Sequence, residues 1–158
     1  MSVAFTREED YESVAANLPD RPVSPHANLV TPEGLAAIEA ELALARAAWA
    51  SAQGGDVKDD RTAMARATRD LRYWSSRRAT AQLVEPTQDG GMVRFGGAVT
   101  VEREDGRRQT WRIVGEDEAD PATGSVSYVS PLAQAVLGKT VGDLVMVAGG
   151  ELEIVGVG

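Results

Sequence analysis

The first half of the chain repeats apolar residues in alternating steps of three and four, the pattern of an amphipathic helix with one apolar seam. Thr31 and Pro32 precede the series and suit a helix cap and first turn, and glycines at positions 54 and 55 interrupt it. The seam before the glycines consists of Leu35, Ile38, Leu42, Ala45, Trp49 and Ala52. The seam after them consists of Met64, Ala67, Leu71 and Trp74. The pattern therefore predicts two helices, the second from about Asp59 to Leu83.

A short glycine turn between two helices predicts an antiparallel coiled-coil hairpin. With roughly 21 to 25 residues at about 1.5 Å per residue, each helix would span about 31 to 38 Å. Such a hairpin is too thin to bury both of its sides, so we expect it to project as an arm.

After Pro86 the pattern changes to the alternation and β-branched runs that are typical of strands. The expected strands are 92–95, 98–102, 109–114, 126–129, 143–147 and 151–155. Asp105-Gly106 and Gly149-Gly150 suit two hairpin turns, and Ser130–Leu137 is expected to form one short helix capped by Ser130. This half of the chain predicts a small antiparallel β-domain with one helix.

These elements divide the chain into three expected segments and place it in the α+β class. Residues 1–30 form an acidic, extended arm that contains three prolines. Residues 31–85 form the helical hairpin, and residues 86–158 form the β-domain.

Composition and charge exclude several classes of protein. The 158 residues carry 16 Lys and Arg against 24 Asp and Glu, and the net charge of -8 disfavours autonomous binding to duplex DNA. Because the chain has no cysteine and one histidine, disulfides, thiol catalysis, zinc fingers and Ser-His-Asp triads are excluded. No apolar run has membrane length and the first residues lack a secretory pattern, so we expect a cytoplasmic protein.

The second predicted helix departs from this acidic balance, because Asp70 is set against several arginines along the helix. The arginines are Arg61, Arg66, Arg69, Arg72, Arg77 and Arg78. Such a run indicates either a solvated helix face or a face that meets an acidic partner or nucleic acid.

The predicted turn between the helices gathers three carboxylates, Asp56, Asp59 and Asp60. One interpretation is structural, because acids at the start of a helix favour its dipole and polar residues solvate a turn. The other is chemical, because carboxylates at the tip of a long arm can enter the cavity of another molecule. There they would complete the oxygen shell of a Mg²⁺ ion that they could not hold alone.

Three blocks in the second half of the chain carry a more specific pattern. They are Trp111–Asp120 (WRIVGEDEAD), Val129–Gly138 (VSPLAQAVLG) and Gly149–Ile154 (GGELEI). In this order the blocks resemble the C-terminal domain of the GreA/GreB transcript-cleavage factors, and the order of hairpin and β-domain matches as well. The resemblance spans roughly residues 30–158 and implies an FKBP-like fold for the β-domain.

The resemblance implies a function in transcription elongation. In that family the C-terminal domain docks on the rim of the secondary channel of bacterial RNA polymerase. The hairpin enters the channel, and its tip carboxylates help the polymerase bind a second Mg²⁺ and cleave backtracked RNA. By their match to the family tip, Asp56 and Asp59 are the expected catalytic and Mg²⁺-binding residues, acting in trans, and Val129, Ser130 and Pro131 fall in the rim-docking segment. The protein itself would be no enzyme and would carry no cofactor of its own.

Departures from the family pattern leave a second function open. The hairpin is shorter by roughly two turns per helix, about 11 Å of reach at about 5.4 Å per turn, and Asp59 replaces a family glutamate. A non-cleaving regulator that occupies the secondary channel is therefore the alternative. Less expected is a peptidyl-prolyl isomerase, because only Phe95, Trp111 and Tyr128 supply aromatic rings to the β-domain. A module that sequesters another regulator through the Arg-rich helix is a third possibility.

Overall fold

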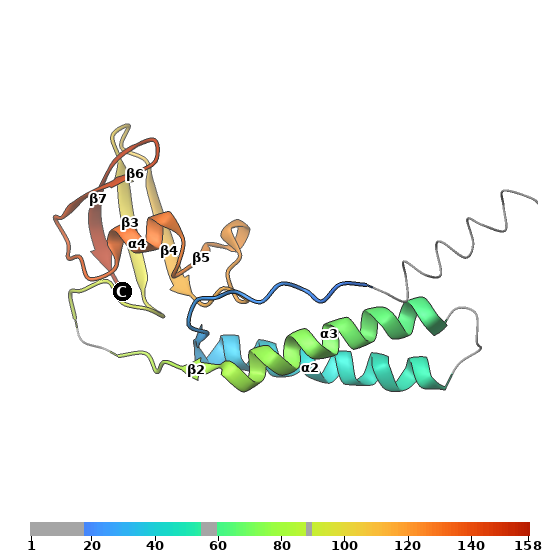
Figure 1. Ribbon diagram of the computed structural model, residues 1–158. Coiled ribbons are helices and arrows are strands. Elements are labelled where there is room, and N and C mark those ends of the chain that lie inside the picture. Colours follow the sequence, from blue (N-terminus) through green and yellow to red (C-terminus); the bar gives the residue numbers. More distant parts are fainter. Residues whose placement is uncertain (1–17, 55–59, 88–89) are drawn as a thin grey trace, which may run out of the picture. The chain divides into compact units, whose positions relative to one another are not determined.

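The chain adopts an α+β fold, as the sequence predicts (Figure 1). The computed structural model describes residues 18–54, 60–87 and 90–158. Within these ranges no helix is long and apolar enough to cross a membrane.

The described residues form two compact units. The helical unit contains Ala37–Thr80 and the described residues up to Pro25, and the sheet unit contains His26–Ala36 and the described residues from Ala81 to Gly158. The division differs from the expected segments 1–30, 31–85 and 86–158. Both flanks of the hairpin belong to the sheet unit, where they pair with each other as short strands.

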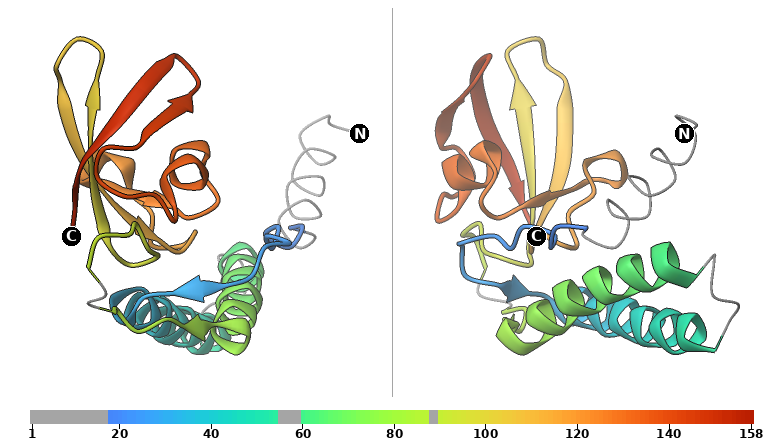
Figure 2. Two further views of the ribbon diagram at one scale, coloured as in Figure 1. Left: turned by 90° about the vertical axis from the view of Figure 1, so that its left-hand side faces the viewer. Right: turned by 45° about the vertical axis from the view of Figure 1, so that its right-hand side comes forward.

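Two long helices make up most of the helical unit and lie side by side (Figures 1 and 2). They are α2 (Pro32–Gln53) and α3 (Asp60–Thr80). The predicted seam is confirmed by the buried side chains Ile38, Leu42, Ala45 and Ala67. Further along the seam, toward the connection between the helices, Trp49 and Met64 are only half-buried. The apolar core of the hairpin therefore thins toward its tip.

The end of α3 corrects the expectation of a helix that reaches Leu83. The helix ends at Thr80, and the next residues form β2 (Gln82–Leu83), which pairs in parallel with β1 (Leu29–Val30). Backbone amides of the β2 segment donate to carbonyls of the β1 segment at 2.8 and 2.9 Å. These bonds replace the last helical turn and turn the end of the expected extended arm into a strand.

The sheet unit is built on a five-stranded sheet with the order β5-β4-β3-β7-β6. Its strands are β3 (Ala98–Arg103), β4 (Arg108–Val114), β5 (Ser125–Ser127), β6 (Leu144–Val147) and β7 (Gly150–Val157). The predicted tight turns join β3 to β4 and β6 to β7, and Gly106 and Gly149 adopt φ values of 85° and 103° there, which favour glycine. The 3-10 turn η1 (Pro121–Thr123) and the short helix α4 (Pro131–Val136) complete the unit.

Two expectations for the sheet need correction. Strand β5 pairs with β4 in parallel, so the sheet is mixed and not purely antiparallel. The connection between β4 and β5, which includes η1, carries the chain back to Arg112 before β5 begins. Strand β5 therefore runs in the same direction as β4 and does not form a hairpin with it. Residues 92–95 form no strand, and only an isolated bridge joins Met92 to Thr140.

The core of the sheet unit lies between the inner face of the sheet and α4. Alternate residues of the strands supply it, as the period of two predicts. Its buried members are Val93, Val99, Val101, Ile113, Val126, Ala133, Val136, Val145, Leu152 and Ile154.

Candidate partner-docking site

The predicted catalytic and Mg²⁺-binding residues, Asp56 and Asp59, lie outside the described residues, as does the turn between the helices. The described chain reaches Gly54 on one side and resumes with Asp60 on the other. The roles assigned to the two carboxylates therefore stay predictions.

The predicted docking residues surround the start of α4. Ser130 caps this helix, because its Oγ accepts a hydrogen bond from the Ala133 amide at 3.2 Å, and Pro131 is the first helical residue. The Val129 amide donates to Ser127 Oγ at 3.2 Å. The local interpretation of Ser130 as a cap is thereby confirmed. Pro131 is exposed, while Val129 and Ser130 are half-buried, so Pro131 is the member of the segment most open to a partner.

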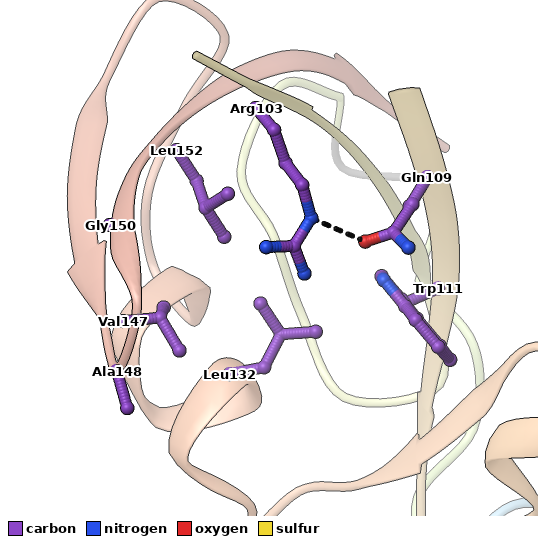
Figure 3. Close-up of a pocket in the computed structure, with 8 residues that line it drawn as sticks. All are labelled: Arg103, Gln109, Trp111, Leu132, Val147, Ala148, Gly150 and Leu152. Atoms are coloured by element: carbon purple, nitrogen blue, oxygen red, sulfur yellow. Dashed lines mark hydrogen bonds between the residues drawn. The ribbon is translucent and has the colours of Figure 1, made fainter. Parts of the chain in front are cut away.

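A hollow of about 80 Å³ opens beside the first turn of α4 (Figure 3). Apolar side chains form most of one wall, and on the other side Arg103, Gln109 and Trp111 come together, with Arg103 Nε donating to Gln109 Oε1 at 3.2 Å. The lining residues are Arg103, Gln109, Trp111, Leu132, Val147, Ala148, Gly150 and Leu152. Leu132, the residue after Pro131, lines the hollow, whereas Val129, Ser130 and Pro131 do not.

The Trp111 indole gives the hollow an unused hydrogen-bond donor. Its Nε1 is buried and has no hydrogen-bond partner among the described residues. A buried N–H without a partner is costly, so a ligand oxygen that reaches it would be favoured. Of the three aromatic residues of the β-domain only Trp111 lines this hollow. Phe95 and Tyr128 pack edge to face with each other, at 5.7 Å between ring centroids.

The acidic block after β4 anchors the start of the hairpin to the sheet within the sheet unit. Thr31 Oγ1 donates to Glu118 Oε2 at 2.6 Å and accepts from the Gly34 amide at 2.9 Å, so the same threonine caps α2. At Gly115, a Cβ would lie 2.3 Å from the Leu29 carbonyl oxygen. This close approach explains the glycine, and the block acts here as a structural anchor.

Arg112 adds a charged clamp to this anchor. Its Nη2 lies 3.1 Å from Glu33 Oε2, its Nη1 lies 3.8 Å from Glu118 Oε1, and its Nε donates to the Gly96 carbonyl. A backbone hydrogen bond and the Arg112 guanidinium lower the pKa of Glu33 below its ordinary value. Both groups are partly solvated, so the pair contributes modestly.

Several arginines of α3 are buried or form ion pairs within the helical unit. This finding argues against a free basic face along the helix. Arg77 is 2% exposed, Arg78 pairs with Glu39 at 3.0 Å, and Arg72 pairs with Asp20 at 3.2 Å. Asp20 belongs to the segment before β1, which therefore contacts α3. No sequence pattern predicts that Arg77 is buried.

Comparison with known proteins gives the family of the chain. A family model described as "Transcription elongation factor, GreA/GreB, C-term" matches residues 87–157. Transcription elongation factor GreA of Desulfovibrio desulfuricans is 43% identical over 96 residues, which cover 60% of this chain and 58% of that protein. Transcription elongation factor GreA of Ruegeria pomeroyi is 33% identical over 136 residues, which cover 75% of this chain and 86% of that protein. The chain belongs to the GreA/GreB family.

Among solved structures, this GreA/GreB-family chain matches the GreA factor homolog 1 (Gfh1) of Thermus thermophilus at 20% identity with a TM-score of 0.40. The match covers 84% of this chain and 99% of that one. Membership of the family confirms the resemblance seen in the sequence.

The sequence pointed to the α4 segment of this family member but missed the hollow beside it. Residues of four strands and one helix line the hollow, and no local pattern joins them. The one available signal was Trp111, because it combines an inward position on a predicted strand with a polar N–H group.

Proposed function

We propose that this GreA/GreB-family protein binds RNA polymerase at the rim of its secondary channel and stimulates cleavage of backtracked RNA. The observation that carries the proposal is the length of the match to GreA of Ruegeria pomeroyi. It covers 86% of that protein and three quarters of this chain, and so extends beyond the C-terminal region alone.

The docking surface in this proposal is the start of α4 with the adjoining hollow. Exposed Pro131 offers a rigid apolar contact, and the hollow of about 80 Å³ accepts one small apolar side chain of the polymerase. The unpartnered Trp111 Nε1 would donate to a carbonyl oxygen of that segment. A buried apolar contact with one fixed hydrogen bond is a common way to give a small interface specificity.

The chemistry in this proposal belongs to Asp56 and Asp59. Carboxylate oxygens are ligands that Mg²⁺ accepts, and two of them complete a metal site that the polymerase itself holds. In that position the ion would lower the pKa of a bound water and stabilise the developing charge. The contribution of this chain is to hold two negative charges at the end of an arm.

The alternative is a regulator that occupies the channel without supporting cleavage. The lengths of the two helices, 22 and 21 residues, motivate it. At about 1.5 Å per residue they span about 33 and 32 Å, the lower part of the expected range.

A cleavage assay on a backtracked elongation complex tests the proposal. Purified polymerase is given saturating wild-type protein, an Asp56→Asn and Asp59→Asn double variant, or a Glu85→Gln and Glu104→Gln control that removes the same two charges elsewhere. Stimulated cleavage with the wild type and the control, and at least tenfold less with the tip variant, is the expected result. Binding of the wild type without added cleavage would favour the alternative, and absence of binding would reject both.

A further inference from the structure

The outer face of β6, on the side of the sheet away from the core, carries the most exposed large apolar residues of the sheet unit. Leu144 and Met146 are 62% and 72% exposed, whereas Val145 between them is buried. Strand β6 is an edge strand of the sheet. Its one edge pairs with β7, and no strand of the described part of the chain pairs with its other edge. Exposed edges are ordinarily protected by charged residues or proline, and β6 contains neither.

The backbone polarity of this edge follows from the ladder with β7. The Ile154 amide donates to the Asp143 carbonyl at 2.9 Å. Because bonded and non-bonded positions alternate along antiparallel strands, positions 145 and 147 also face β7. The amides and carbonyls of Leu144 and Met146 therefore point to the open edge, where they are available to another strand.

Two glutamates of β7 accompany the apolar residues on the same face. The register places Glu153 opposite Leu144 and Glu151 opposite Met146. No side-chain hydrogen bond or ion pair engages either carboxylate within the residues that the structure describes. In the next strand, by contrast, Glu102 pairs with Arg108 at 2.9 Å. Two exposed apolar side chains thus lie next to two carboxylates that form no ion pair among the described residues.

We propose that the edge and outer face of β6 bind an extended protein segment with Lys or Arg at alternate positions. Such a segment would add a strand to β6 through the free groups of Leu144 and Met146. At about 4.8 Å between strands, the added strand would lie about 10 Å from β7. A long cationic side chain spans this distance, because its stem lies over the apolar residues of β6 while its head reaches Glu151 or Glu153. A second copy of the chain fits less well, because β6 has no cation to offer.

The first experiment uses the full chain and a synthetic capped peptide of alternating Lys and Val with seven residues. Binding is followed by NMR, together with the hydrogen exchange of the Leu144 and Met146 amides. We expect the exchange of both amides to slow, because both face the open edge and would donate to backbone carbonyls of the peptide. A peptide with the same residues in two blocks keeps the charge but loses the alternation, and should bind at least fivefold more weakly.

The second experiment separates recognition from general electrostatics. A Glu151→Gln and Glu153→Gln variant should bind the alternating peptide about fivefold more weakly, whereas a Glu41→Gln and Glu85→Gln control, which removes two exposed charges elsewhere, should change binding less than twofold. Met146→Pro should abolish strand addition and leave the β6–β7 ladder intact, since the amide it removes faces the open edge. Met146→Ala separates loss of the side chain from loss of the amide, and thermal unfolding verifies the fold of each variant.

Equal weakening by the two glutamine pairs would overturn the proposal, and so would amide protection at other sites. Self-association that Met146→Pro abolishes, without binding of the peptide, would assign the edge to a second copy and also overturn it. These outcomes are independent of cleavage, so the proposal and the proposed function can fail separately.

Discussion

The sheet unit and the helical unit are stabilised in different ways. The sheet unit has a core of ten buried apolar residues between the sheet and α4. The helical unit, among its described residues, buries Ile38, Leu42, Ala45, Ala67 and the charged Arg77. Its segment before β1 is held by exposed contacts, including Arg21 3.9 Å from the centroid of the Tyr73 ring.

Because of this difference, the two units suit different functions. A packed core keeps side chains in fixed rotamers, which suits a docking surface that must match a partner. A thin two-helix arm gains less from burial, because most of the stability of a helix in a protein comes from packing of its apolar face. The comparison predicts that equal chemical changes will cost unequal free energies in the two units.

The largest effect is expected from Ile113→Ala in the sheet core. Ile113 is fully buried, so the substitution leaves a cavity in rigid surroundings and should lower the free energy of unfolding by about 3–4 kcal/mol. Thermal unfolding followed by the near-ultraviolet signal of the aromatic side chains, to which Trp111 contributes, measures the loss. A change below about 1 kcal/mol would contradict the account of a tightly packed core.

The next largest effect is expected from Gly115→Ala, which tests the anchor of the hairpin start. The new Cβ would lie 2.3 Å from the Leu29 carbonyl oxygen, so the β1 segment must move. We expect a loss of about 2–3 kcal/mol, with faster hydrogen exchange in β1 and β2. As a control, Gly138→Ala meets no atom within 4 Å but has a φ of 80°, so it reports backbone strain without a clash. Unchanged exchange in β1 would contradict the anchor.

The matched change in the helical unit is Ile38→Ala. Ile38 is 2% exposed, but its surroundings are two helices with half-buried neighbours that can collapse around the gap. The expected loss is about 2 kcal/mol, at the low end for this substitution. It is measured from ellipticity at 222 nm during thermal unfolding. A loss equal to or larger than that of Ile113→Ala would reverse the comparison.

The smallest effect concerns the pH dependence of the anchor. The pKa of Glu33 is lowered from its ordinary value of 4.5, so the stability it contributes is present above that value and disappears as the pH falls through the lower, folded value. Glu33→Gln should therefore flatten the dependence of the midpoint of thermal unfolding on pH below about 5. Glu104→Gln, at an exposed turn, should leave it unchanged. Identical pH profiles for Glu33→Gln and the wild type would refute the clamp.

The parts of the fold that local patterns encode were predictable. The start of α2 at Pro32 follows from its cap, and the buried Ile38 and Leu42 follow from the seam. The end of α3 was not predictable in this way, because the pairing of β2 with β1 joins residues about 50 positions apart. The parallel pairing of β5 joins residues 13 positions apart, as in Arg112 with Ser125, and depends on the path of the connection between the strands, which no local pattern encodes.

The candidate site was predictable only in part. Ser130 and Pro131 have a local signature, since a cap and a proline mark the start of a helix. The hollow beside them depends on how five elements meet, and the free donor of Trp111 appears only when its neighbours are in place. The burial of Arg77 is similarly a tertiary property, because arginine is ordinarily exposed.

The most direct measurement compares a docking variant and a tip variant in one cleavage titration on a backtracked polymerase complex. Pro131→Glu changes the exposed docking residue at a helix position that tolerates an acid, and Asp56→Asn with Asp59→Asn removes the tip charges. Our account predicts that Pro131→Glu raises the concentration for half-maximal cleavage about tenfold and preserves the rate at saturation. The tip variant should lower the saturated rate at least tenfold without shifting that concentration. If both variants change the same parameter, or neither changes any, docking and chemistry are not divided between the sheet unit and the hairpin tip.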